Sequence, residues 1–419
     1  MRVAMVAACE FPALRGSQVL VRDLATDLVD LGHDVHLVTY SGGERFDAVA
    51  RPEPGAGGAA GAFGGVAGRL ARNLRLGVNL YRVVRRQRID VIHAHNYEAP
   101  FLAYVTRWLT GTPVVYHSHN ALSDELATYV GGRWTKALAR KLGALLDRQV
   151  PRRADFAIAL TSELEEFLLQ CGVERERLGV VPPGVATGTT ESPALSGVGD
   201  GEFVVAYAGN LDPYQDLDVL FNGYLHFRRQ VQNAILLLIT HEIDWRRRAG
   251  WLLEELVRRG LARVAVLPTF PDVQAQLQRA DALICPRSSW SGYPIKLLNY
   301  MASGRPVVAA AGSAKGIADG ANGLVFRNGD ALHLAEQLQR LHGDPTLRRR
   351  LGECAQNAVR KNHDRKKIAS EIARIHARLG SRQSGRGSIG GPRGVGGLRR
   401  LIALLGRRVS TIFATRTTR

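Results

Sequence analysis

Short apolar segments alternate with helical segments along this chain, and the alternation occurs twice. In the first half the apolar segments are Arg2–Ala8, His33–Tyr40, Asp90–His95, Thr112–His119 and Ala154–Leu160. In the second half they begin with Phe203–Asn210 and Ala234–Thr240 and continue as VAVLP, ALICP, PVVAA and GLVF. Apolar strands that follow helices in this way are typical of parallel sheets covered by helices on both faces. The pattern therefore predicts an α/β protein with two doubly wound domains.

A change in composition separates the two halves. The stretch from Gly184 to Gly201 is rich in Gly, Ser, Thr and Pro, which is typical of a linker. The predicted units are a first domain over 1–185, a linker over 186–201, a second domain over 202–362, a helix over 363–379 that crosses back to the first domain, and a Gly/Arg-rich linker and basic tail over 380–419. Ligands of doubly wound sheets bind beyond the carboxyl ends of the strands. We therefore expect the binding site in a cleft between the two domains.

Cysteine use and charge narrow the class of protein. The four cysteines are scattered and form no CxxC pair, which argues against a zinc site or a disulfide framework and predicts a reducing compartment. No secretory signal is visible, and no apolar segment approaches the ~20 residues that span a bilayer, so a cytoplasmic location is expected. The net charge of +18 comes almost entirely from arginine and is typical of a polyanionic partner or a solvated basic surface.

The last residues carry an organised part of this charge. A helix over 397–416 would place its apolar residues on one face and Arg399, Arg400 and Arg407 on the other. A basic amphipathic helix suits an anionic membrane surface, which predicts a peripheral location on the inner face of the cell membrane. A plain solvated tail and a nucleic-acid contact are the alternatives. Because no recognised nucleic-acid-binding module is present, no nucleic-acid partner is expected.

The segment from Cys285 to Ala310 carries the clearest sign of a ligand. It runs from an apolar strand through a Ser/Gly/Pro turn into a helix that opens near Pro294, a residue suited to a first helical turn. The free N–H groups and the dipole of a helix N-terminus favour an anion. Lys296 adds a positive charge, and Asn299 points the same way one turn later. We therefore expect a phosphate-bearing ligand at this helix.

A second loop could also approach a phosphate. Gly16 and Ser17 follow the first predicted strand, where backbone N–H groups can reach a ligand. A simple tight turn is the alternative for these two residues. The loop does not match the dinucleotide fingerprint GxGxxG, so a nicotinamide cofactor is not expected.

Histidines gather at the ends of two predicted strands. His119 ends the segment Thr112–His119, where it either contacts a ligand or forms a hydrogen-bonded cap, and His117 is expected on the opposite face of the sheet. His93 and His95 form a similar pair, but no carboxylate accompanies them, so no metal site is predicted there.

The chain resembles the retaining glycosyltransferases of the GT-B fold, family 4. The resemblance covers roughly residues 1–377 and rests on the first strand with its glycine loop and on LATDLVDLGHDVHLVT, which begins at Leu24. It also rests on VVPPGV at Val180 and on GIADGANGLVFRNGD, which begins at Gly316. This resemblance implies two facing Rossmann-like domains. It also implies a nucleotide-diphosphate sugar as co-substrate without a further cofactor, transfer with retention of configuration, and no metal.

The resemblance also implies where each substrate binds. The donor would lie mainly on the second domain and the acceptor, a glycan or a lipid-linked saccharide, mainly on the first. Family members often carry an active-site histidine at the position of His119, close to the transferred sugar.

This chain departs from the family pattern at its polar anchors. The family motif has two glutamates separated by seven residues, and the corresponding positions here are Ser291 and Asn299. Asn210 replaces an arginine of the family, and Gln215 lies near the position of its lysine. We expect the two remaining cations to neutralise the diphosphate. The predicted catalytic residues are His119, Lys296 and Arg287. The predicted donor-binding residues are Gly16, Ser17, Gly209, Asn210, Ser291, Gly292, Tyr293, Pro294 and Asn299.

Three alternatives to a transferase stay open on the sequence. The missing glutamates favour a non-catalytic protein that binds a nucleotide sugar or a glycan. A GT-B-like enzyme of another chemistry, such as an epimerase, is disfavoured because no acid/base carboxylate is well placed. Nucleic-acid binding would follow from the net charge of +18 and would show a steep salt dependence.

Overall fold

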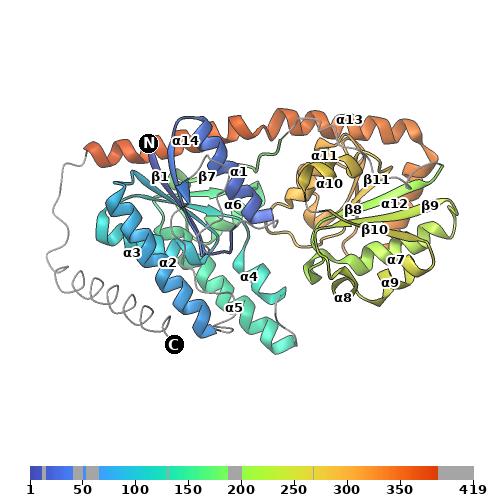
Figure 1. Ribbon diagram of the computed structural model, residues 1–419, viewed down its shortest axis with the longest axis horizontal. Coiled ribbons are helices and arrows are strands. Elements are labelled where there is room, and N and C mark those ends of the chain that lie inside the picture. The colour runs from blue at the N-terminus through green and yellow to red at the C-terminus, as the bar shows by residue number, and fades with distance from the viewer. Residues whose placement is uncertain are drawn as a thin grey trace, which may run out of the picture.

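The computed structural model describes residues 1–11, 16–40, 51–52, 66–128, 130, 132–186, 201–267 and 269–385. Most of the predicted linker and the whole predicted membrane segment 397–416 lie outside the described residues. The described chain forms two α/β domains, side by side in Figure 1, and the predicted fold class is confirmed.

The N-terminal domain is built on a parallel seven-stranded sheet. Its strands are β1 (Arg2–Ala7), β2 (Asp34–Val38), β3 (Arg51–Pro52), β4 (Val91–His95), β5 (Val114–Ser118), β6 (Phe156–Ala159) and β7 (Leu178–Val180). They pair in the order β3-β2-β1-β4-β5-β6-β7. The helices are α1 (Gly16–Asp30), α2 (Val66–Arg86), α3 (Glu98–Thr110), α4 (Leu122–Glu125), α5 (Arg133–Gln149) and α6 (Ser162–Gln170). The central strands are buried along their length, as expected for a sheet with helices on both faces.

The C-terminal domain repeats this plan with a parallel six-stranded sheet. Its strands are β8 (Phe203–Ala208), β9 (Ala234–Thr240), β10 (Ala262–Val266), β11 (Ala282–Cys285), β12 (Val307–Ala310) and β13 (Leu324–Phe326). They pair in the order β10-β9-β8-β11-β12-β13. The helices are α7 (Leu217–Arg228), α8 (Trp245–Ala249), α9 (Trp251–Arg258), α10 (Phe270–Leu277), α11 (Ile295–Ala302), α12 (Ala331–Gly343) and α13 (Pro345–Asn362). In both sheets the strand order reverses beside the first strand, which is where doubly wound sheets bind ligands.

The last helix returns to the first domain. Helix α13 lies on the C-terminal domain, and α14 (Arg365–Gly385) continues across the N-terminal domain along the upper edge of Figure 1. Arg365 donates two hydrogen bonds to the carboxylate of Asp27 on α1, at 2.9 and 2.7 Å. Ile372 and Leu379 are buried in the core beneath it. The C-terminal helix therefore completes the hydrophobic core of the N-terminal domain.

Among the described helices, none is both long and apolar enough to cross a membrane.

Candidate active site

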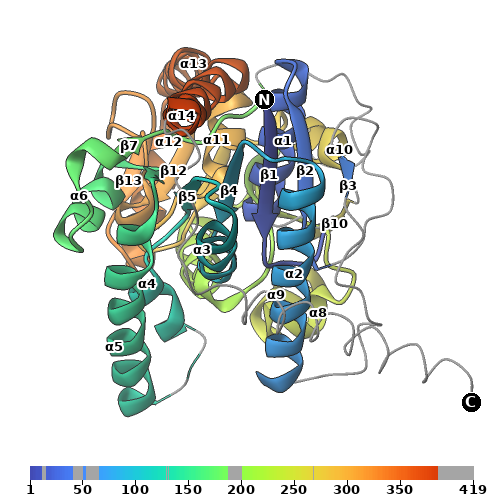
Figure 2. The same cartoon turned by 90° about the vertical axis from the view of Figure 1, so that its left-hand side faces the viewer.

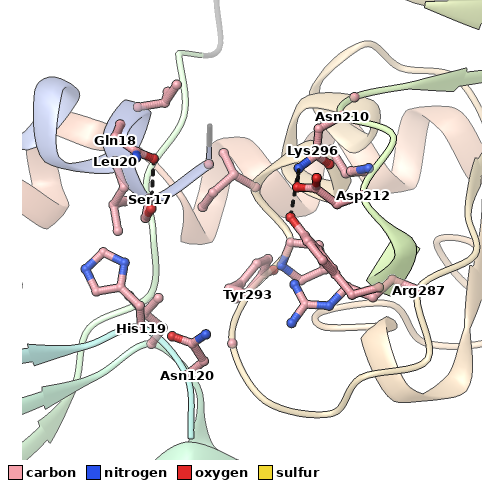
Figure 3. Close-up of a pocket in the computed structure, with 18 of the residues that line it drawn as sticks. Ser17, Gln18, Leu20, His119, Asn120, Asn210, Asp212, Arg287, Tyr293 and Lys296 are labelled. Atoms are coloured by element: carbon pink, nitrogen blue, oxygen red, sulfur yellow. Dashed lines mark hydrogen bonds between the residues drawn. The ribbon is translucent and has the colours of Figure 1, made fainter. Parts of the chain in front are cut away.

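A cleft of about 1090 Å³ lies between the two domains. It is lined from one side by the start of α1 and the loop after β5, and from the other by the loops after β8 and β11 and the start of α11. Figure 3 shows Ser17 and His119 on one side and Lys296 and Arg287 on the other. All the residues predicted to be catalytic or donor-binding line this cleft.

Helix α11 brings Lys296 into the cleft. The helix begins at Ile295 with Pro294 as its N-cap, as the sequence predicted. Lys296 Nζ donates hydrogen bonds to Tyr207 Oη at 2.6 Å and Gln215 Oε1 at 2.8 Å. Among the described residues it forms no ion pair, and burial lowers its pKa from 10.5 to about 7. This is a partly buried amine held by neutral groups, and an anionic ligand would stabilise its charged form.

Gly209 leaves room for this amine. The residue follows β8 with φ of 150°, and a Cβ built there would lie 2.6 Å from Lys296 Nζ. Any side chain at this position would therefore displace the lysine. The glycine is required both by its backbone conformation and by this close approach.

Arg287 shapes the loop between β11 and α11. Its Nη2 donates to the carbonyl oxygen of Ser291 at 2.7 Å and to Ser289 Oγ at 3.2 Å. Its guanidinium lies 5.5 Å from the centre of the Tyr214 ring. Its Nε is buried and has no partner among the described residues. The side chain therefore orders the loop and contributes a second positive charge to the cleft.

Two of the residues that depart from the family pattern, Asn210 and Gln215, belong to one hydrogen-bonded network. Gln215 Nε2 donates to Asn210 Oδ1 at 2.6 Å, and Asn210 Nδ2 donates to Asp212 Oδ2 at 2.6 Å. Because its amide nitrogen is held in this way, Gln215 presents its oxygen to Lys296. The network therefore replaces direct cationic anchors with a frame that orients one lysine.

Ser291 makes a contact that its position in the sequence does not suggest. Its Oγ donates to Asp124 Oδ2 at 2.6 Å, and Ser289 Oγ donates to the same oxygen at 2.7 Å. Asp124 belongs to α4 of the N-terminal domain, so these bonds join the two domains. Asp124 lies 167 residues before Ser291, and no local pattern predicted the pair.

The domains also approach closely through their backbones. A Cβ at Gly292, whose φ is 77°, would lie 2.8 Å from the carbonyl oxygen of His119. A Cβ at Gly16 would lie 3.6 Å from Ile295 Cγ1. Ser17, beside it, bonds through Oγ to Gln18 at 3.0 Å. The predicted phosphate loop of α1 therefore faces the start of α11 across a narrow cleft.

His119 lies at the cleft end of a buried histidine cluster. His95 Nδ1 lies 3.1 Å from His119 Nε2, and His93 Nε2 lies 3.1 Å from His117 Nδ1. His93 Nδ1 in turn lies 2.9 Å from Nε2 of His376 on α14. Burial lowers the pKa of each, that of His119 to about 4. All five imidazoles are therefore neutral at neutral pH.

One expectation about this cluster was wrong. His117 does not face away from His119, because the two rings lie 5.1 Å apart. Residues two apart on a strand project to the same face, and the earlier expectation reversed this rule. His93 and His95 stack for the same reason, with ring centres 4.6 Å apart. Ligand nitrogens of His93, His95 and His117 lie within 4.8 Å of one another and could hold a metal ion.

Asn299, Tyr293 and the neighbouring Trp290 differ in whether a ligand can reach them. Asn299 lines the cleft, and its side chain has no hydrogen-bond partner among the described residues, so it is available to a ligand. The hydroxyl of Tyr293 already has a partner within the protein, because it donates a hydrogen bond to the carbonyl oxygen of Lys315 at 3.1 Å. Trp290 does not line the cleft and packs edge-on against Phe167 of α6, with ring centres 5.5 Å apart.

Comparison with known families agrees with this architecture. Residues 14–188 match the family profile described as Glycosyltransferase Family 4. Residues 202–344 match the profile described as Glycosyl transferases group 1. The two matches together cover most of both domains.

Two curated relatives align with 63% and 81% of this chain. The chain is 30% identical over 278 residues to a D-inositol 3-phosphate glycosyltransferase of Nocardia farcinica, covering 63% of this chain and 61% of the relative. It is 26% identical over 362 residues to a protein of the same name from Pseudarthrobacter chlorophenolicus, covering 81% of this chain and 85% of the relative. The chain thus spans less than two thirds of the Nocardia protein.

Solved structures share the fold at low sequence identity. Sucrose-phosphate synthase from Thermosynechococcus elongatus has a TM-score of 0.75 at 17% identity, covering 90% of this chain and 98% of that one. Anabaena HepE in complex with UDP-glucose has a TM-score of 0.68 at 17% identity, covering 90% and 100%.

Proposed function

This chain belongs to the family 4 glycosyltransferases of the GT-B fold, and on that premise we propose that it transfers a sugar from a nucleotide-diphosphate sugar to an acceptor. The observation that supports this most is the position of Lys296. Its amine is held by Tyr207 and Gln215 without a carboxylate partner among the described residues, beside the N-terminus of α11. Such a site stabilises an added anion.

The proposed chemistry needs charge stabilisation at the leaving group. When the bond between the anomeric carbon and the donor phosphate oxygen breaks, negative charge develops on the diphosphate. Lys296, Arg287 and the free N–H groups of α11 would receive that charge, and their fixed positions avoid reorganisation in the transition state. The acceptor oxygen bonds to the same carbon, and the proton of its hydroxyl passes to the departing phosphate oxygen, so the products are the glycoside and the nucleoside diphosphate.

The transferred sugar would lie between the domains, near His119. Because His95 occupies Nε2 of His119, the other ring nitrogen is left for a sugar hydroxyl. The imidazole is neutral, so it can hold the sugar without adding a positive charge beside a developing oxocarbenium ion. Asn299 lines the cleft, and its side-chain amide would bond ribose hydroxyls as both donor and acceptor. We include retention of configuration and metal independence in the proposal because the family resemblance implies both.

The donor and acceptor can be narrowed for testing. UDP donors are the first choice, because a structural relative of this chain is described in complex with UDP-glucose. The curated relatives act, by name, on an inositol phosphate, so small phosphorylated acceptors belong in the panel. A lipid-linked saccharide is our preferred acceptor, and it would place the protein at the membrane surface.

A nucleotide-sugar panel tests the proposal. The full chain is incubated with UDP-, GDP- and ADP-sugars, and bound ligand is detected by native mass spectrometry. We expect one donor to bind, and we expect diphosphate release when acceptor extracts or defined acceptors are added. Failure of every donor to bind would overturn the donor site.

A non-catalytic sugar-nucleotide binder is the second candidate. This candidate is favoured by the replacement of both motif glutamates, by Ser291 and Asn299. In addition, the Ser291 hydroxyl is already bonded to Asp124 of the other domain. In the same panel this candidate predicts donor binding without nucleoside-diphosphate release. Measuring binding and release on one sample therefore separates the two functions.

A further inference from the structure

Helix α5 exposes an unusual apolar stripe. Trp134 is 87% exposed, Leu138 69%, and Leu142 51%. Their spacing of four residues, with Leu145 following, places them on one side of the helix. Large apolar side chains that gather on an exposed face mark an interaction site more often than scattered ones do.

The charged residues of α5 are almost all basic. The helix carries five cations, Arg133, Lys136, Arg140, Lys141 and Arg148. In the described part of the chain none of these five forms an ion pair. The one acid of the helix, Asp147, is buried and accepts hydrogen bonds from the N–H groups of Leu122 and Ser123, both at 2.9 Å. The exposed surface of α5 therefore combines apolar and positive groups.

Only the second half of α5 is fixed to the domain. A Cβ at Gly143 would lie 2.5 Å from Ser123 Cα, so α4 packs directly against the helix at this point. Asp147 reinforces that contact. Residues 133–138 are exposed all round, and Figure 2 shows α5 projecting from the lower edge of the N-terminal domain. The stripe is thus carried on a firmly anchored, projecting helix.

The stripe continues into the cleft. Leu142 and Leu146 of α5 line it, and so do Leu122 and Leu126 from the neighbouring turn. An apolar path therefore runs from Trp134 at the projecting end to the acceptor side of the cleft.

We propose that α5 docks on an anionic lipid surface. Its apolar stripe then guides the lipid part of a membrane-embedded acceptor toward the cleft, and this second step rests on the proposed glycosyl transfer. An apolar face bordered by cations is the combination that binds at the headgroup level of an anionic bilayer. Helix α5 and the predicted membrane segment 397–416 are different parts of the sequence.

Charge argues against the chain's own tail as the occupant. Residues 386–419 contain eight arginines and no acidic residue, so they repel a basic helix. A second copy of α5 would bring the same positive charges together. An anionic lipid surface satisfies both the apolar and the basic parts of the helix.

Vesicle binding tests the proposal with matched variants. The double variant Trp134→Ser/Leu138→Ser removes exposed apolar groups outside the cleft. Its control, Trp251→Ser/Leu332→Ser, removes groups that are 76% and 59% exposed on the other domain. We expect the first variant to bind phosphatidylglycerol vesicles at least about tenfold more weakly than the full chain, and the control to bind like it. Equal binding by the two variants would overturn the proposal.

The charge component has its own pair of variants. Lys136→Glu/Arg140→Glu should weaken binding to phosphatidylglycerol vesicles far more than Arg360→Glu/Lys361→Glu on α13, although both change the net charge equally. If the two pairs act alike, only the net charge matters and α5 is not the site. If Trp134→Ser/Leu138→Ser instead abolishes a dimer in light scattering, a second copy covers the helix and the proposal fails.

Contact with lipid can be located directly. Vesicles containing brominated lipid should quench tryptophan fluorescence of the full chain, and Trp134→Phe should remove most of that quenching while binding persists. Quenching that survives in Trp134→Phe would place the contact elsewhere. Donor binding is measured on the same variants, and loss of vesicle binding with donor binding intact separates this inference from the proposed transferase function.

Discussion

Ser291 Oγ donates a hydrogen bond to the carboxylate of Asp124 at 2.6 Å, and the two residues belong to opposite domains. Ser291 stands where the family motif has its first glutamate. In this protein a carboxylate therefore reaches the same part of the cleft from the N-terminal domain, where it also accepts a hydrogen bond from Ser289.

Because Asp124 supplies this carboxylate, we expect that restoring the motif glutamate at position 291 weakens donor binding or turnover. Ser291→Glu would place two carboxylates together, and charges about 4 Å apart repel by roughly 4 kcal/mol at an effective dielectric of 20. We expect donor affinity or turnover to fall at least tenfold, as measured by calorimetry or diphosphate release. Ser291→Glu/Asp124→Ser exchanges the two groups and should recover most of the loss. A double variant as weak as the single one would contradict the exchange.

Lys296 should bind the donor diphosphate in a pH-dependent way. Lys296→Met removes a charge-assisted contact worth about 1.5–3 kcal/mol, or roughly 10- to 100-fold in Kd for the nucleoside diphosphate. Burial lowers the pKa of Lys296 to about 7, so in the protein without donor the Lys296 ammonium loses its proton as pH rises through that value. Wild-type affinity should therefore decrease from pH 7 to pH 9.

Two variants test whether the Lys296 amine causes this pH dependence. Lys296→Met should show a flat affinity profile over the same range of pH, and its thermal stability should be unchanged or higher, because a partly buried charge is removed. Lys361→Met, on the exposed part of α13, should match the wild type. A melting temperature of Lys296→Met well below that of the wild type would indicate a structural role instead.

Gly209 should be essential for donor binding. Gly209→Ala combines an unfavourable φ of 150° with a Cβ 2.6 Å from Lys296 Nζ, so the lysine must move. Gly260 is the matched control, since its φ is 70° and a Cβ there meets no atom within 4 Å. Both alanine variants should lose about 1 kcal/mol of stability from backbone strain. Only Gly209→Ala should lose donor binding in a thermal-shift titration.

The buried histidines predict loss of stability in acid. In the folded state burial lowers their pKa values, to about 4 for His119 and about 3 for His376, whereas the unfolded chain titrates near 6.5. The unfolded state therefore binds more protons below pH 6.5, and the free energy of unfolding falls as pH drops from 6.5 to about 4. Each histidine contributes up to about 1.4 kcal/mol per pH unit.

Replacing His376 measures how much one buried histidine contributes to the pH dependence of the free energy of unfolding. His376→Gln keeps a hydrogen-bonding group beside His93 but cannot take up a proton. Guanidinium unfolding at pH 7, 6 and 5 should show a shallower dependence on pH for this variant than for the wild type. Parallel curves would mean that His376 titrates normally in the folded protein.

Local patterns predicted the frame of the cleft well. The strand ending at Cys285 and the helix after Pro294 were placed correctly, because an apolar strand, a turn and a proline each act over a few residues. The position of Lys296 and Asn299 in the cleft follows from helical spacing alone. These features depend on neighbours in the sequence.

Contacts between distant segments could not be predicted in the same way. Asp124 meets Ser291 only because the two domains face each other, and Tyr207 meets Lys296 because β8 and α11, far apart in the sequence, pack within one domain. The roles of Gln215 and Asn210 likewise depend on a hydrogen-bonded network rather than on their own chemistry. The side of the sheet occupied by His117 was predictable in principle, and the error there lay in applying the strand period.

The return of α14 to the first domain links folding to the order of synthesis. Residues 365–385 are synthesised after both sheets, yet Ile372 and Leu379 fill the core of the domain that is made first. The core of the N-terminal domain is therefore complete only after the second domain has been synthesised, and a fragment ending at residue 186 would expose part of this apolar core. Cutting the chain between its two domains would not yield two self-sufficient halves.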